Sequence, residues 1–292
     1  MSVLRPHSPS AGDNAPGYRA IRWNMDWITR PLFGIALAGV AIGVLFSRPE
    51  FFASLVILIT ILSAYEWHRM VAAGRAYRVE TAVTSVTAAI AVILLLTLRQ
   101  AWPALLAVAL GAAVAVIVAR SRHESPLWQA VGVVYLGLPA LALVSLRTFP
   151  HRGALVIVGL FLIVWASDTG ALIFGNLIGG PRMAPRLSPS KTWAGTIGGS
   201  VTAAFVFGCY VWLLGGTLWI ASLFALVFSV VAHAGDLFES FVKRQFGIKN
   251  SGALIPGHGG VLDRMDSTIF ASVALALLVF VAHFNLLFGV AS

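Results

Sequence analysis

Acidic side chains cluster at one place in this chain, on either side of a polar stretch between two apolar runs. Residues 235–267 read GDLFESFVKRQFGIKNSGALIPGHGGVLDRMDS. Asp236 belongs to the run before the stretch, and Asp263 and Asp266 share one predicted helix face at the start of the run after it. Carboxylates that converge raise one another's pKa unless a cation balances them, and oxygen ligands suit Mg²⁺ or Mn²⁺. These three residues therefore predict a site for a hard divalent cation.

Structural roles explain only part of this pattern. An acid in the first turn of a helix stabilises the helix dipole, which accounts for one of Asp263 and Asp266. A helix leaving the membrane accounts for Lys243 and Arg244. Neither explanation covers Asp236, because an ionisable residue inside an apolar run usually faces a cavity or a partner. Helical spacing places Asp236 on a polar stripe, with Glu239 and Arg244 beside it; the stripe consists of His233, Asp236, Ser240 and Lys243.

The segment IPGHGG, residues 255–260, separates these two groups of acids. Its glycines allow the backbone to approach a ligand closely, and consecutive N–H groups can bind phosphate. His258, Gly259 and Gly260 are therefore candidate substrate-binding residues. The structural alternative is a simple turn rich in glycine and proline.

A second polar connection has the sequence RLSPSKTWAG, residues 186–195. We expect Ser188, Lys191 and Thr192 to lie at the N-terminus of a helix, where hydroxyl groups, free N–H groups and a lysine form an anion site. The alternative assigns Ser190 the role of an N-cap and Lys191 that of a topology signal.

The composition indicates an all-α, polytopic membrane protein. The chain of 292 residues is 59% hydrophobic and 11% charged, whereas soluble domains carry about 25% charged residues. Nine apolar runs have about the length that a transmembrane helix needs. They lie at 30–47, 51–67, 81–98, 101–119, 127–146, 153–175, 192–214, 217–239 and 266–288.

The distribution of basic residues predicts the orientation of these runs. With a cytosolic N-terminus, nine spans place 16 of the 20 Lys and Arg residues on the cytosolic side, as the positive-inside rule requires. The net charge of +9 thus reflects topology, and no nucleic-acid partner is implied. Both polar connections face the cytosol, and Asp168 lies in the cytosolic half of the sixth run. We expect a cytosolic tail at 1–29, transmembrane helices at 30–150 and a catalytic region at 151–292.

Carboxylates, cationic side chains and glycine-rich turns on one membrane face indicate metal-assisted handling of a phosphate-rich soluble molecule. A cation-coupled transporter is an alternative, with Asp168 and Asp236 as ion ligands. The sequence shows no evident inverted repeat, and its charges gather on one side of the membrane. An intramembrane aspartyl protease ranks last, since the basic, glycine-rich loop has no role in its chemistry.

The run SFVKRQFGIKNSGALIPGHGGVLDRMD, residues 240–266, resembles the signature of phosphatidate cytidylyltransferases, or CDP-diacylglycerol synthases. The upstream segments WASDTGALIFG and LSPSKTWAGTIGG also resemble that family. Two positions depart from its pattern. Asn250 stands where the family usually has Asp, and Ala194 where it commonly has Glu or Gln.

The resemblance implies a reaction in which CTP and phosphatidic acid give CDP-diacylglycerol and pyrophosphate. It implies Mg²⁺ as the cofactor, with Mn²⁺ as a possible substitute and a second cation as a possible addition. It implies metal and catalytic roles for Asp236, Asp263 and Asp266, with Lys243 and Arg244 also catalytic. The implied substrate-binding residues are Ser188, Lys191, Thr192, His258, Gly259, Gly260, Arg264 and Asp168.

The resemblance also implies a bacterial inner-membrane enzyme with a cytosolic active site. A CTP-dependent polyprenol or lipid kinase is the nearest alternative, and it would release CDP. The oligomeric state is left open, a homo-oligomer included.

Overall fold

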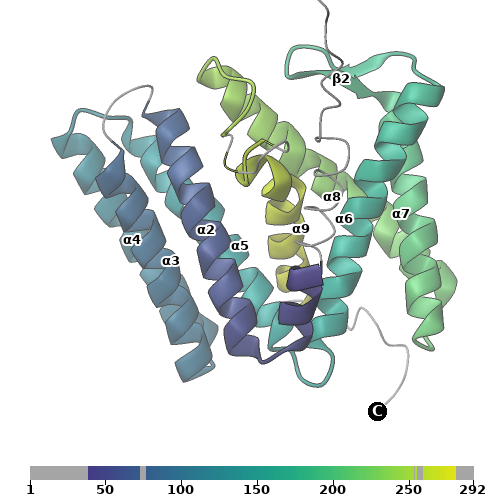
Figure 1. The fold of residues 1–292 in the computed structure, drawn as a ribbon, viewed down its shortest axis with the longest axis horizontal. Coiled ribbons are helices and arrows are strands. Elements are labelled where there is room, and N and C mark those ends of the chain that lie inside the picture. The colour runs from purple at the N-terminus through teal and green to yellow at the C-terminus, as the bar shows by residue number, and fades with distance from the viewer. Residues whose placement is uncertain (1–38, 73–76, 253, 255–258, 281–292) are drawn as a thin grey trace, which may run out of the picture.

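The computed structural model describes residues 39–72, 77–252, 254 and 259–280. A helical segment at 39–46 is followed by eight longer helices in these residues (Figure 1). They are α2 (Pro49–Val71), α3 (Arg78–Leu98), α4 (Ala101–Ser121), α5 (Pro126–Arg147), α6 (Gly153–Leu177), α7 (Trp193–Leu213), α8 (Leu218–Gln245) and α9 (Leu262–Phe280).

Seven of the described helices, α2 to α8, are long and apolar enough to cross a membrane. They confirm the second to eighth predicted spans. The chain is thus an integral membrane protein built from helices, and large apolar side chains such as Ile117 and Phe205 are exposed on the outer faces, where lipid replaces water. The first predicted span lies largely outside the described residues. The end of the ninth predicted span also lies outside the described residues. Its described part is α9, which has three charged side chains in its first turns.

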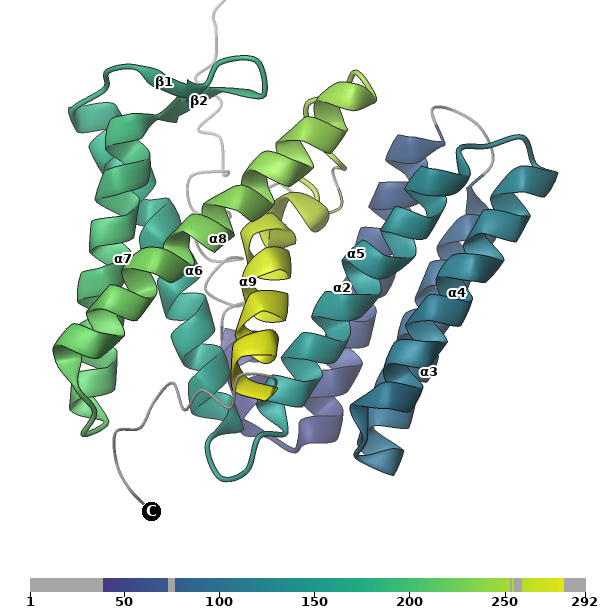
Figure 2. The same cartoon turned by 180° about the vertical axis from the view of Figure 1, so that it is seen from behind.

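The helices form two groups with α9 between them. The helices α2 to α5 pack together on one side, and α6, α7 and α8 on the other (Figures 1 and 2). The central helix α9 contacts α8, α5, α6 and α2. A residue on α9 can therefore reach both groups.

Residues 188–192 form β2 (Ser188–Thr192), which pairs antiparallel with β1 (Arg182–Ala184) in a hairpin at one end of the bundle (Figure 2). Our expectation of a helix N-terminus is thus correct for Thr192, which directly precedes α7, and wrong for Ser188 and Lys191. The residue before a proline is biased toward extended backbone, and proline lacks the N–H that a helix interior uses. Pro189 therefore favours a strand here. Ser190 is not a cap: Thr192 caps α7, and its Oγ1 accepts a hydrogen bond from the N–H of Gly195 at 3.1 Å.

An aromatic cluster lies between α2, α5, α8 and α9. Trp67, which is fully buried, packs against Tyr135, with ring centroids 5.0 Å apart. Tyr135 in turn contacts Phe238 of α8 and Phe270 of α9. Large aromatic rings supply much of the buried apolar area of a core. This cluster fixes α8 against α9 next to the three aspartates.

Candidate active site

A polar pocket of about 590 Å³ lies where α8 ends, α9 begins and the hairpin approaches them. It brings together residues that are far apart in the sequence, including most of the predicted site. Its lining residues are Leu187, Ser188, Pro189, Ser190, Lys191, Asp236, Ser240, Lys243, Arg244, Lys249, Asn250, Gly259, Asp263, Arg264 and Asp266.

A close crossing of α8 and α9 places Asp236 and Asp266 in the same pocket. Gly235 lies at the crossing, where a Cβ atom would stand 2.5 Å from the carbonyl oxygen of Asp266 and 3.1 Å from Cβ of Phe270. Real Cβ atoms do not come so close to backbone oxygen, so only glycine fits without a shift of one helix. The backbone of Gly235 thus sets the spacing between the two acidic helices.

The hairpin contributes a cation to the first of these acids. Lys191 of β2 forms an ion pair with Asp236 of α8. Both side chains are about three-quarters buried, with 20% and 26% exposed. Ser240, one turn further along α8, donates a weaker hydrogen bond of 3.4 Å to the same carboxylate. This contact joins the hairpin to the acidic end of α8.

Lys243 bridges two acids. Its Nζ donates to Oε2 of Glu239 at 3.1 Å and to Oδ1 of Asp263 at 2.9 Å. The lysine side chain is 13% exposed and that of Glu239 is fully buried. A buried carboxylate without a partner is costly, so Lys243 stabilises the site in addition to any role in substrate binding.

Asp263 also organises the loop before α9. Its carboxylate accepts hydrogen bonds from the N–H groups of Ser251, at 3.2 Å, and Gly260, at 3.1 Å. Burial alone would raise the pKa of Asp263, but the hydrogen bond and charge of Lys243 and the two backbone N–H groups outweigh it and hold that pKa below its ordinary value. The carboxylate is therefore ionised at neutral pH.

Glu239 and Asp266 form a second pair of acids in the same region. Their carboxylates interact electrostatically, and Lys243 is the hydrogen-bond partner of Glu239. From its sequence position we expected Glu239 only to lie beside the polar stripe. Its spacing of four residues from Lys243 was the signal that could have identified the ion pair.

Glu66 is a buried acid to which we gave no role in the site. It lies between Tyr65 and Trp67 in α2 and is fully buried. Its Oε2 accepts from the N–H of Leu262 at 2.8 Å and from Oγ of Ser251 at 3.3 Å. A Cβ at Gly252 would collide with this carboxylate. Glu66 thus connects the loop before α9 to the helix group α2 to α5. Hydropathy does not show that this acid is buried, so its role had no signal in the sequence.

Four predicted residues do not line the pocket or cannot be placed. Thr192 is buried as the cap of α7, and Gly260 donates its N–H to Asp263. Asp168 is an exposed residue of α6 that interacts electrostatically with Asp236, Asp266 and Lys191. His258 lies outside the described residues.

Arg244 connects α8 to the hairpin. Its Nε donates to the carbonyl oxygen of Leu187 at 3.2 Å, and its Nη1 to that of Ile248 at 3.3 Å. The guanidinium group has five N–H donors, so others remain for a ligand. Arg244 can hold the mouth of the pocket in shape and still bind an anion.

A preassembled metal cage is not present in the described part of the chain, where no three Asp, Glu, His or Cys side chains are grouped as ligands. Magnesium is usually held by one or two carboxylates together with substrate phosphates and water. Asp236, Asp263 and Asp266 line one pocket with basic residues and offer oxygen ligands of this kind. The residues fit a cation that binds together with a phosphate-bearing substrate.

Two curated bacterial proteins are similar to about half of this chain. A phosphatidate cytidylyltransferase of Brucella melitensis is 48% identical over 153 residues, which cover 51% of this chain and 56% of that protein. One of Staphylococcus haemolyticus is 39% identical over 150 residues, with 51% and 56% covered. The chain thus spans about half the length of the curated relatives that it matches.

The sequence pattern of the cytidylyltransferase family matches a longer region, residues 28–282. This region includes every helix from α2 to α9 and every residue that lines the polar pocket. The resemblance predicted from residues 240–266 is confirmed: the chain belongs to the cytidylyltransferase family.

Proposed function

We propose that this protein transfers the cytidylyl group of CTP to phosphatidic acid, giving CDP-diacylglycerol and pyrophosphate for phospholipid synthesis. The observation that carries the proposal is the polar pocket, in which acidic and basic side chains alternate within a protein of transmembrane helices. Family membership and the printed names of the relatives support it. A soluble nucleotide and a membrane lipid would meet at this pocket.

The proposed topology has nine spans, a cytosolic N-terminus and a pocket that faces the cytosol. The bias of Lys and Arg supports this orientation, and the bacterial relatives support an inner-membrane location. Residues 1–29 would form a cytosolic tail, 30–150 a supporting helical region and 151–292 the catalytic region. Phosphatidic acid would enter the site sideways from the bilayer.

The reaction needs positioning more than proton transfer. A phosphate oxygen of phosphatidic acid attacks the α-phosphorus of CTP, and the bond from that phosphorus to the bridging oxygen of the β-phosphate breaks. The electron pair leaves with pyrophosphate. The attacking phosphate is already anionic at neutral pH, so no strong general base is required. The protein must hold two anions in line and offset their repulsion.

Basic side chains around the pocket are suited to that task. We assign phosphate binding to Lys191, Lys243, Arg244 and Arg264, because each lines the pocket and cationic groups stabilise charge on a leaving pyrophosphate. The hydroxyl of Ser188 and the backbone of Gly259 line the same space. We retain Asp168, Thr192, His258 and Gly260 as predicted substrate-binding residues.

The acids have a different role. Asp236, Asp263 and Asp266 would hold Mg²⁺, or Mn²⁺ in its place, and a second cation could join them. When bound, the cation supplies positive charge that offsets the charge of the phosphates. The ion pairs of Asp236 with Lys191 and of Asp263 with Lys243 keep these carboxylates in place.

The test is turnover by the purified full chain with CTP, phosphatidic acid and Mg²⁺. We expect CDP-diacylglycerol and pyrophosphate in equal amounts, and a loss of at least about a hundredfold in turnover for Asp263→Ala. An Asn250→Asp variant shows whether the departure from the family pattern changes cation preference. Absence of CDP-diacylglycerol with native lipid present, or full activity of Asp263→Ala, would exclude the proposal.

A further inference from the structure

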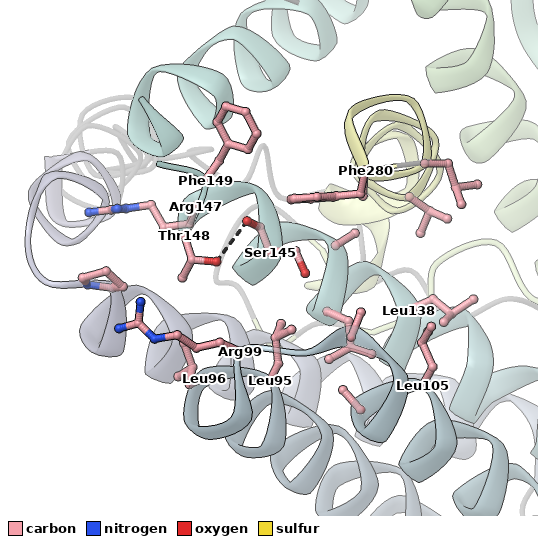
Figure 3. Close-up of a pocket in the computed structure, with 18 of the residues that line it drawn as sticks. Leu95, Leu96, Arg99, Leu105, Leu138, Ser145, Arg147, Thr148, Phe149 and Phe280 are labelled. Carbon is pink, nitrogen blue, oxygen red and sulfur yellow. Dashed lines mark hydrogen bonds between the residues drawn. The ribbon is translucent and has the colours of Figure 1, made fainter. Parts of the chain in front are cut away.

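A second cavity, of about 830 Å³, lies at the other end of the bundle (Figure 3). Its walls come from α3, α4, α5 and α9, and the α5–α6 connection and the start of α2 close one end. The volume is in the range of small-molecule sites. Most lining side chains are aliphatic or aromatic, for example Leu95, Leu105, Leu138, Leu141, Leu277 and Phe280.

This cavity is separate from the polar pocket. Asp266 lines the pocket and Phe280 lines the cavity, both on α9. Phe280 is 14 positions after Asp266, which corresponds to about 21 Å at the rise of an α-helix. The two sets of lining residues have none in common. The cavity therefore opens near the opposite surface of the membrane.

The polar groups of the cavity gather at one end. Figure 3 shows Arg99, Arg147 and Thr148 at that end and Leu105 and Leu138 at the other. Arg99 follows the last residue of α3, and Arg147 is the last residue of α5. Helix ends lie near the membrane surface, so cations at the surface adjoin an apolar space that extends into the bilayer.

The charges at this end favour an anion. No carboxylate in the described part of the chain forms an ion pair with Arg99. Arg147 donates two hydrogen bonds to the carbonyl oxygens of Leu45, at 2.8 Å, and Ser47, at 2.6 Å, and three of its five N–H donors remain. His151 adds a further donor.

One acid also lines this end. Glu50 stands 3.4 Å from Nε of Arg48, and both side chains are largely exposed, at 61% and 78%. Its charge acts on Arg147 as well as on Arg48. Arg99 and Arg147 still outnumber this one acid at the polar end of the cavity.

We propose that this cavity binds one anionic phospholipid from the membrane leaflet opposite the active site. An acyl chain would lie along the apolar walls of α4, α5 and α9, and the phosphate would contact Arg99 and Arg147. Arginine suits phosphate because its planar donors can bind two oxygens at once. The site is independent of catalysis, so its test does not depend on turnover.

The test is native mass spectrometry of the detergent-solubilised full chain with dioleoyl phosphatidylglycerol or dioleoyl phosphatidylcholine. The acyl chains are identical, so only the head group differs. We expect phosphatidylglycerol to bind about tenfold more tightly, and Arg99→Gln to remove about that advantage, as expected for one charge-assisted hydrogen bond. Ala276→Trp places a large ring in the cavity and should weaken binding of both lipids.

Two matched variants act as controls. Arg152→Gln removes an arginine from the same membrane side outside the cavity, and Lys191→Gln removes a cation from the polar pocket. Both should retain this binding event. Equal binding of the two lipids, or unchanged binding in both Arg99→Gln and Ala276→Trp, would overturn the proposal. So would an Ala276→Trp variant with altered oligomeric state and unaltered lipid binding, because the cavity would then be an interface between copies.

Discussion

The two ends of α9 serve two differently built sites. At its N-terminus, the polar pocket contains acids and bases that already pair with one another, as Lys191 does with Asp236 and Lys243 with Asp263. At its C-terminus, the cavity is apolar, and Arg99 forms no ion pair with a described acid. The internal ion pairs of the first site compensate part of the charge of its acids. The second has two arginines and one acid, Glu50, at its polar end, so a cationic group remains for an external anion.

The internal pairing has a consequence for catalysis. A pocket lined by unpaired aspartates would depend on a metal to remain folded, because converging carboxylates repel one another. Here lysines supply part of that compensation. In the proposed reaction, the cation would then arrive and leave with the nucleotide.

Removal of the cation should have the largest effect on turnover and little effect on stability. We expect chelation of divalent cations to lower turnover to background, with recovery on addition of Mg²⁺. The midpoint of thermal unfolding should change by less than about 2 °C, because lysines already compensate two of the acids. Binding of phosphatidylglycerol in the cavity should be unaffected. Activity that persists in chelator would contradict the metal assignment.

Substitution of a pocket acid comes next. We expect Asp236→Asn to lower turnover by about a hundredfold or more, since the neutral amide binds a cation and a lysine less well. The matched control is Glu124→Gln, which makes the same change outside both pockets. Equal turnover of Asp236→Asn and Glu124→Gln would show that Asp236 has no catalytic role.

Loss of one cationic side chain from each site should change the free energy of unfolding by different amounts. Lys243→Gln leaves the buried Glu239 and Asp263 without their shared partner, and we expect a loss of about 3–5 kcal/mol in the free energy of unfolding. Arg99→Gln removes an exposed cation, and we expect a change within about 0.5 kcal/mol. Chemical denaturation in detergent measures both. Similar losses in the two variants would remove the distinction between the sites.

The smallest predicted effect concerns the helix crossing. We expect Gly235→Ala to destabilise the protein by about 1–3 kcal/mol through overpacking and to lower turnover, because α8 and α9 must separate. The control is Gly43→Ala, in the helical segment 39–46, where an added Cβ meets nothing within 4 Å. That variant should have equal or higher stability. A Gly235→Ala protein with unchanged turnover would show that this spacing does not limit catalysis.

The sequence predicted the membrane helices well because one property, the length of an apolar run, determines them. It also predicted that Asp236, Asp263 and Asp266 share a site, since the polar stretch between two helices brings their ends together. The hairpin was missed because residues 188–192 contain both helix-start signals and Pro189. These residues form a strand and not a helical turn because they pair with β1.

Long-range partners of the site could not be predicted. Glu66 reaches Ser251, 185 residues further along the chain, and no local pattern encodes that contact. The same holds for Lys191 and Asp236, whose pairing depends on how the hairpin folds against α8. The cavity at the other end of α9 was also unpredicted, because its walls consist of the same apolar residues that face lipid elsewhere.

The most direct test of the proposed reaction follows the phosphorus atoms of CTP. The full chain is incubated with phosphatidic acid, Mg²⁺ and CTP labelled at either the α- or the γ-phosphate. Cytidylyl transfer predicts that the α-label enters the lipid and that the γ-label leaves in pyrophosphate. Entry of the γ-label into the lipid, with release of CDP, would show a lipid kinase and contradict the account.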